Sequence, residues 1–184
     1  KAGLPGRLFI VDGVNGSLTE VGRTGYPFIR GLSFNPITGA LWGWTEKGPV
    51  TINTTTGAAT LVKTIRGYTV DGLAWSNDGA TLYLAESNRL YTYNPVTHAI
   101  KRIDTFKRKI EALEMGPDGY LLMGQNESRK VVIYDPLAQR MVHGIEDDHR
   151  PEHRGWHRPS RIIDFINVSP YNDPEGIAWN VCNP

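Results

Sequence analysis

The chain has 184 residues, of which 40% are hydrophobic and 21% charged, and twenty Lys and Arg residues nearly balance nineteen Asp and Glu residues. This balance argues against a general binder of nucleic acid or of membrane surfaces. One cysteine, Cys182, excludes an internal disulfide framework and a cysteine-based metal cluster. The apolar runs are too short to cross a bilayer, so we expect one globular domain over residues 1–184 without a transmembrane segment.

The first predicted element is a hairpin, LFIVDGVNGSL (Leu8–Leu18) continuing into LTEVG. Its turn begins at Asp12, and an Asp or Asn (Asx) side chain hydrogen-bonds the backbone two residues further on. The same pattern of a strand followed by Asx recurs at Asn53, Asn94 and Asp135, each 41 positions after the previous one. The chain is therefore predicted to be a repeat, and this hairpin is half of one unit.

A complete unit follows, with predicted strands IRGLSFNP (29–36), ALWGWTE (40–46), VTIN (50–53) and ATLVKT (59–64). Equivalent strands recur over residues 70–106 and 110–145. Four short strands per unit and a period near 41 are the signature of a β-propeller blade. A β-sandwich also has regular short strands, but its strands are not serial copies of one another. The predicted fold is therefore an all-β propeller.

The third unit is followed by an insertion, residues 146–170, and then by PEGIAWN (174–180), a copy of the first strand of each unit. The chain thus starts with the two outer strands of a blade and ends with an inner strand. Propellers share a blade between their termini in this way, which leaves no open sheet edge. Two interpretations stay open: a small four-unit ring closed by the termini, or a ring with further blades outside this chain.

Polar side chains are expected around one mouth of the central channel, because the first strand of each blade begins there and the second strand ends beside it. The expected set is Arg30, Glu46, Asp71, Glu86, Glu111, Gln125 and Glu175. Crowded carboxylates raise one another's pKa unless a cation lies among them. Oxygen ligands of this kind suit Ca²⁺ or Mg²⁺. The alternative is that Arg30 bridges its neighbours and water solvates the rest.

The stretch VDGLAWSNDGATLYLAES (70–87) resembles the gluconolactonase and regucalcin propellers, and PEGIAWN resembles the opening strand of that family. The resemblance implies a Ca²⁺-dependent lactonase or esterase, with Asp71, Glu86 and Glu175 as metal ligands and Glu111 with Arg30 positioning substrate. The blade pattern is also similar to bacterial NHL and YVTN propellers, most of which are binding modules.

The insertion combines histidines, arginines and a tryptophan, and long loops within a compact repeat are often functional. Arg and Trp are enriched at interface hot spots, so we predict a loop that docks a protein partner. The expected docking residues are His149, Arg150, His153, Arg154, Trp156, His157 and Arg158. A zinc site at the three histidines and a solvated loop are the alternatives.

Tryptophans recur at related strand positions. Trp42 and Trp44 face the same side of one strand, and Trp75 and Trp179 are equivalent by repeat, which favours packing between blades over stacking on a sugar. The leading functional prediction is a non-catalytic binding or structural module with a protein partner and no nucleic acid. A location outside the cytoplasm follows from the resemblance to secreted propellers. A Ca²⁺-dependent hydrolase, and a sugar-binding propeller using Trp42, Trp44 or Trp156, are the alternatives, and no catalytic residue is identified.

Overall fold

All regular structure in the described part of the chain is β-strand; the computed structural model describes residues 6–126 and 131–141. The strands of the first half are β1 (Arg7–Val11), β2 (Leu18–Arg23), β3 (Arg30–Phe34), β4 (Leu41–Thr45), β5 (Gly48–Ile52) and β6 (Ala59–Leu61). Those of the second half are β7 (Gly72–Trp75), β8 (Leu82–Glu86), β9 (Arg89–Tyr93), β10 (Ile100–Thr105), β11 (Ile110–Met115), β12 (Leu121–Gln125), β13 (Val131–Asp135) and β14 (Arg140–Met141). These ranges contain no helix that could cross a membrane.

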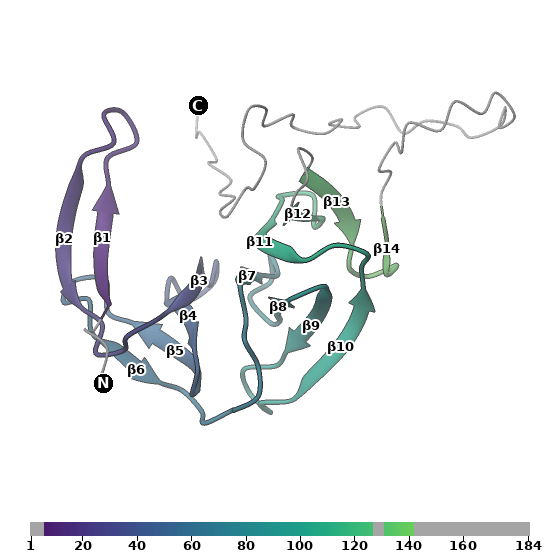
Figure 1. The fold of residues 1–184 in the computed structure, drawn as a ribbon, viewed down its shortest axis with the longest axis horizontal. Helices are drawn as coiled ribbons and strands as arrows, with labels where there is room; N and C mark the ends of the chain where they lie inside the picture. Colours follow the sequence, from purple (N-terminus) through teal and green to yellow (C-terminus); the bar gives the residue numbers. More distant parts are fainter. Residues whose placement is uncertain (1–5, 127–130, 142–184) are drawn as a thin grey trace, which may run out of the picture.

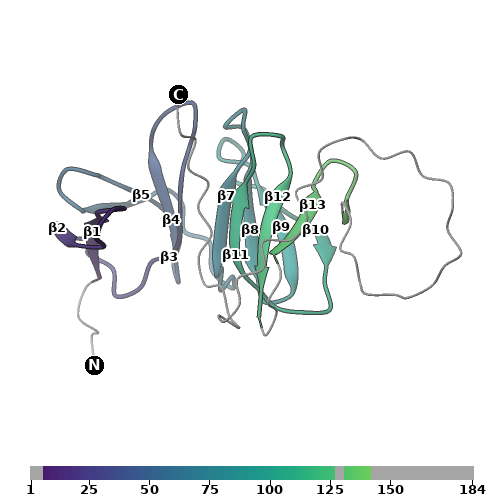
Figure 2. The ribbon, with the colours of Figure 1, turned by 90° about the horizontal axis from the view of Figure 1, so that it is seen from above.

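The strands form antiparallel sheets in the order β3–β4–β5–β6, β7–β8–β9–β10 and β11–β12–β13–β14, with β1 and β2 as a separate hairpin. In Figure 1, β3, β7 and β11 lie toward the middle of the molecule and the last strand of each sheet lies toward the outside. Figure 2 shows the sheets side by side. These sheets are the predicted four-stranded blades. Residues 174–180, on which the predicted ring closure depends, and the insertion lie outside the described residues.

The predicted Asx turns are confirmed. Oδ1 of Asn53 accepts hydrogen bonds from the backbone N–H groups of Thr55 at 2.8 Å and Thr56 at 2.9 Å. The same pair of hydrogen bonds forms at Asp12, Asn94 and Asp135. The same Asx turn thus follows β1, β5, β9 and β13, which is why the repeat is visible in the sequence.

The core lies between neighbouring blades rather than inside a single sheet. Trp44 and Trp75 are almost fully buried. Trp75 meets Trp42 edge to face with ring centroids 5.1 Å apart, and Trp44 meets Tyr93 in the same way at 5.7 Å. The predicted packing of Trp75 between blades is confirmed, and its equivalent, Trp179, lies outside the described residues.

The inner strands approach one another closely. A Cβ atom on Gly72 would lie 3.0 Å from the backbone nitrogen of Leu113, and one on Gly31 would lie 3.0 Å from the backbone nitrogen of Leu73. Glycine is therefore needed where β3 meets β7 and where β7 meets β11. The residues just before these contacts, Arg30 and Asp71, are brought together as a result.

Candidate functional site

Four charged side chains alternate in sign across three consecutive blades. Nη1 of Arg30 donates a hydrogen bond to Oδ1 of Asp71 at 2.7 Å. Nζ of Lys109 lies 3.3 Å from Oδ2 of Asp71 and 2.9 Å from Oε1 of Glu111. We call Arg30, Asp71, Lys109 and Glu111 the mouth row. The sequence placed three of these residues at one mouth of the channel, and the structure brings them together.

Lys109 is the member that sequence reasoning missed. It precedes β11, and residues two apart in an extended segment face the same side, so its spacing from Glu111 was the available signal. Its hydrogen bond to Glu111 raises the pKa of Lys109, and the charge of Asp71 acts in the same direction. Lys109 therefore stays protonated, and it keeps the two carboxylates it contacts from repelling each other.

The remaining predicted mouth residues occupy different surroundings. Oε1 of Glu86 accepts a hydrogen bond from the backbone N–H of Thr69 at 2.8 Å. Glu46 is exposed, whereas Gln125 is buried. Glu175 and the seven predicted docking residues of the insertion lie outside the described residues.

Two adjoining cavities open at this mouth. The charged cavity, of about 470 Å³, is lined by Arg30, Gly67, Thr69, Asp71, Glu86, Ser87, Asn88, Arg89 and Lys109. The aromatic cavity, of about 170 Å³, is lined by Tyr26, Pro27, Phe28, Arg30, Trp44, Thr45, Glu46, Tyr68, Thr69 and Val70. Arg30 and Thr69 belong to both linings, so the two cavities form one continuous surface.

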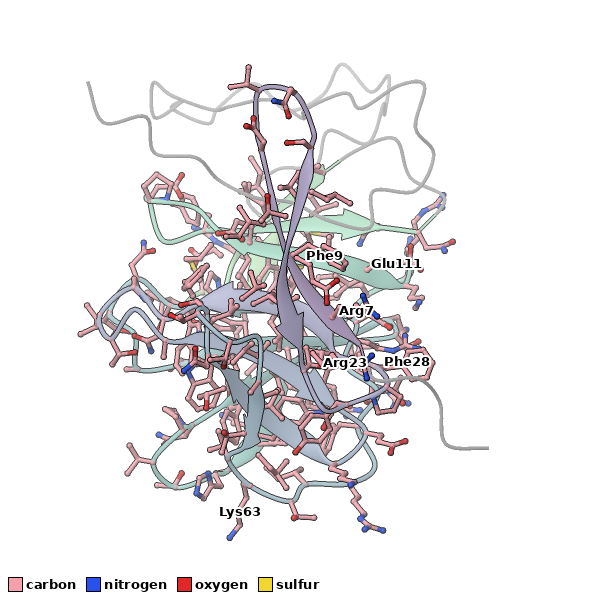
Figure 3. All side chains as sticks on the ribbon, turned by 90° about the vertical axis from the view of Figure 1, so that its left-hand side faces the viewer. Arg7, Phe9, Arg23, Phe28, Lys63 and Glu111 are labelled. Carbon is pink, nitrogen blue, oxygen red and sulfur yellow. The ribbon has the colours of Figure 1, made fainter. Side chains whose placement is uncertain are left out.

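An aromatic ring and two cations are accessible on this surface. Phe28 is 72% exposed. The side chain of Arg30 is 54% exposed and that of Lys109 is 42% exposed, whereas that of Asp71 is 12% exposed. In Figure 3, Phe28 and Glu111 project on the same side of the molecule. A ligand that approaches this mouth therefore meets Phe28, Arg30 and Lys109 before it meets the carboxylate of Asp71.

The described residues do not by themselves make a calcium site. Asp71 and Glu86 supply oxygen donors to one cavity, as Ca²⁺ requires. Each carboxylate oxygen of Asp71, however, already faces a cation. Within residues 6–126 and 131–141, no three His, Cys, Asp or Glu side chains are grouped to hold a metal. The arrangement is instead a row of ion pairs without net charge, the mouth row, beside the aromatic cavity.

No family model matches the chain, and a comparison with curated protein sequences finds no match either. Solved structures with the same fold do exist. Nidogen, from the structure of a nidogen–laminin complex, is 15% identical and has a TM-score of 0.57, with 74% of this chain and 54% of nidogen covered. A regucalcin from Agrobacterium tumefaciens, titled a calcium-binding protein, is 19% identical with a TM-score of 0.53, covering 73% of this chain and 52% of that one.

A third similar structure is the extracellular domain of a one-component system from B. thetaiotaomicron, at 18% identity and a TM-score of 0.54. There, 96% of this chain aligns with 23% of the other. These likenesses define the fold as a β-propeller. The chain spans about half of the nidogen and regucalcin chains and about a quarter of the third.

Proposed function

We propose that this chain is a non-catalytic binding propeller that holds a protein partner at its channel mouth, as part of an extracytoplasmic complex. The observation that carries the proposal is the juxtaposition of the aromatic and charged cavities, with Arg30 in both linings. Aromatic residues and Arg are enriched at the centres of protein interfaces, where they supply most of the binding energy.

The charges of the mouth favour recognition over chemistry. The carboxylates of Asp71 and Glu111 are each paired with a cation, so neither is poised as an isolated acid or base. The guanidinium of Arg30 has several donors and is half exposed, which leaves it able to bind a partner's carboxylate or carbonyl groups as well as Asp71.

The structural neighbours support the same proposal without deciding it. Nidogen was solved in a complex with laminin, and the B. thetaiotaomicron structure is an extracellular domain. The predicted docking loop over residues 146–170 is proposed as a second contact for the same partner.

The test uses two double variants, each of which removes one exposed apolar side chain and one positive charge. Phe28→Ala with Arg30→Ala removes the exposed ring and the shared cation of the mouth. Leu137→Ala with Lys101→Ala makes the corresponding change at exposed positions that line neither cavity. Partners captured from the envelope and secreted proteins of the source organism are purified, and each is titrated calorimetrically against wild type and both variants.

We expect the mouth variant to bind at least about tenfold more weakly, because hot-spot truncation costs roughly 2 kcal/mol or more. The control variant should bind like wild type. A purified partner that binds all three proteins equally would contradict docking at the mouth.

A Ca²⁺-dependent hydrolase remains the second candidate, because Asp71 and Glu86 line the same cavity. Calcium would have to displace Arg30 or Lys109 from Asp71, so we expect Asp71→Asn to abolish any calcium binding that exists. Wild type is first titrated calorimetrically with millimolar Ca²⁺. If it binds no calcium, the Ca²⁺-dependent hydrolase is excluded.

A further inference from the structure

The charged cavity lies over the second blade, between two blades that the structure also describes. Its lining comes from the segment before β7, from the turn between β8 and β9, from Arg30 of β3 and from Lys109 before β11. β7 contacts both β3 and β11, and it lies between them in Figure 1 and Figure 2. Described residues therefore form the walls of this cavity on both sides of β7.

Cations outnumber carboxylates in this lining, and the carboxylates are already engaged. The cations are Arg30, Arg89 and Lys109, and the carboxylates are those of Asp71 and Glu86. Arg30 and Lys109 contact Asp71, and a backbone N–H binds Glu86. Arg89 is exposed, and its guanidinium has no hydrogen-bond or ion-pair partner within the described residues. The lining thus has one positive charge in excess.

Further cations lie beside the cavity. Arg66 precedes Gly67 of the lining, and Lys107 lies two residues before Lys109. Arg66 and Lys107 are exposed, and neither has an ion-pair partner within residues 6–126 and 131–141. Positive charge that is not neutralised nearby attracts an anionic group, over a distance of roughly 8 Å at physiological salt.

Two of the cations are held in position before any ligand binds. Arg30 donates to Asp71 through Nη1, and a guanidinium has further N–H donors that remain for a ligand. Nζ of Lys109 is held between the carboxylates of Asp71 and Glu111. A bound anion does not have to order these side chains, which lowers the entropic cost of binding.

We propose that the charged cavity binds the carboxylate of a Glu or Asp side chain of the partner protein. The proposal rests on partner docking at the mouth and adds the chemistry by which the partner is recognised. The carboxylate pairs with the guanidinium of Arg89 and with the remaining donors of Arg30. One negative charge matches the excess positive charge, whereas a phosphoryl group, with a charge of about −1.5 to −2, would leave a surplus beside Asp71 and Glu86.

The test uses three peptides with blocked ends and one sequence, which differ at a single central position occupied by Glu, Gln or Lys. Inorganic phosphate is a fourth probe. Backbone amide resonances of ¹⁵N-labelled wild type report where each probe binds and how tightly. The Glu peptide should shift the resonances of residues 67–71, 86–89 and 107–110. It should bind about tenfold more tightly than the Gln peptide, because hydrogen bonds between charged groups exceed those to neutral groups.

The Lys peptide should bind most weakly of the three peptides, and phosphate should bind more weakly than the Glu peptide. Raising the NaCl concentration from 50 to 300 mM should weaken the Glu peptide and leave the Gln peptide nearly unchanged, because salt screens exposed charges.

Arg89→Gln should remove most of the preference for the Glu peptide over the Gln peptide. Lys101→Gln is the matched control, because Lys101 is an exposed cation of the same blade that lines neither the charged nor the aromatic cavity. It should keep the preference. The dispersion of the amide resonances of each variant establishes that it is folded.

Four results would contradict the proposal: equal affinity of wild type for the Glu and Gln peptides, a preference that survives in Arg89→Gln, no binding of any peptide at millimolar concentration, or tighter binding of phosphate than of the Glu peptide. The last result would indicate a site for small anions.

A failure of partner docking gives a different result. If the partner binds the Phe28 and Arg30 double variant like wild type, docking at the mouth is contradicted even when the Glu peptide keeps its preference. If the partner loses affinity for that variant but the Glu and Gln peptides bind equally, docking holds and the carboxylate contact alone is contradicted.

Discussion

At the scale of single residues, the turn after each Asx strand is completed by a residue in the left-handed backbone region. Glycine holds this position in the first two turns, as Gly16 and Gly57, but His98 has φ 60° and Gln139 has φ 52°. Side chains other than glycine are strained there. Nδ1 of His98 lies 2.8 Å from the hydroxyl of Tyr93 in a hydrogen bond, which offsets part of that strain.

Gln139→Gly should therefore stabilise the protein by about 0.5–1 kcal/mol, because relief of the left-handed strain exceeds the added flexibility of the unfolded chain. Urea unfolding followed by tryptophan fluorescence measures the change. Ala138→Gly is the matched control, since Ala138 is outside the left-handed region and glycine there should be neutral or destabilising. A lower urea midpoint for Gln139→Gly than for wild type would refute the explanation.

At the scale of strands and blades, most of the architecture could be predicted because residues close together in the sequence determine the turns. The Asx turns recur at a fixed spacing and make their own hydrogen bonds, so the strands between them could be placed without tertiary information. The contact between Arg30 and Asp71 could also be predicted, since equivalent positions of adjacent blades are neighbours in space.

Other parts of the site could not be predicted, because they depend on how the blades pack. Lys109 precedes its strand, and its contact with Asp71 of another blade depends on the spacing between blades. Glu114 lies in the middle of β11, whose mostly apolar sequence predicts a strand of the hydrophobic core. Whether such a residue faces a neighbouring blade or a cavity is set by the angle between sheets, which no local pattern encodes.

The close approach of the inner strands gives a prediction at this scale. Gly72→Ala should destabilise the protein by about 1–3 kcal/mol, because the new methyl group would press on the backbone of Leu113 and Ala112, and backbone cannot move aside as a side chain can. Thermal unfolding measures the loss. Gly13→Ala serves as the control, since a Cβ there meets nothing within 4 Å and its effect should be small. Equal melting temperatures for the two variants would show that the inner strands can separate.

At the scale of the whole molecule, Glu114 links stability to pH. In the unfolded chain this carboxyl loses its proton near its ordinary pKa of 4.5, whereas burial in the folded protein raises its pKa to about 7. Between these values the folded protein binds more protons than the unfolded chain. The contribution of Glu114 to the free energy of unfolding therefore falls as pH rises from about 4.5 to 7, and it is lowest above pH 7.

Glu114→Gln should remove this dependence. The difference in free energy of unfolding between variant and wild type should shift in favour of the variant as the pH rises from 5 to 8, when both are measured by urea denaturation in the same buffers. A difference that stays constant over this range would mean that the carboxyl titrates normally in the folded protein.

The mouth row has a further consequence for how the repeats find their order. Arg30, Asp71 and Glu111 occupy one position in three successive copies of the same unit, yet they do not share one charge. Copies with identical charges would repel at the mouth, because that position brings neighbouring blades into contact. Arg30 and Asp71 have opposite charges, and Lys109 lies between the carboxylates of Asp71 and Glu111. These contacts therefore favour one order of neighbouring blades. The second blade pairs opposite charges with the first, whereas the third blade docked beside the first would place Lys109 next to Arg30.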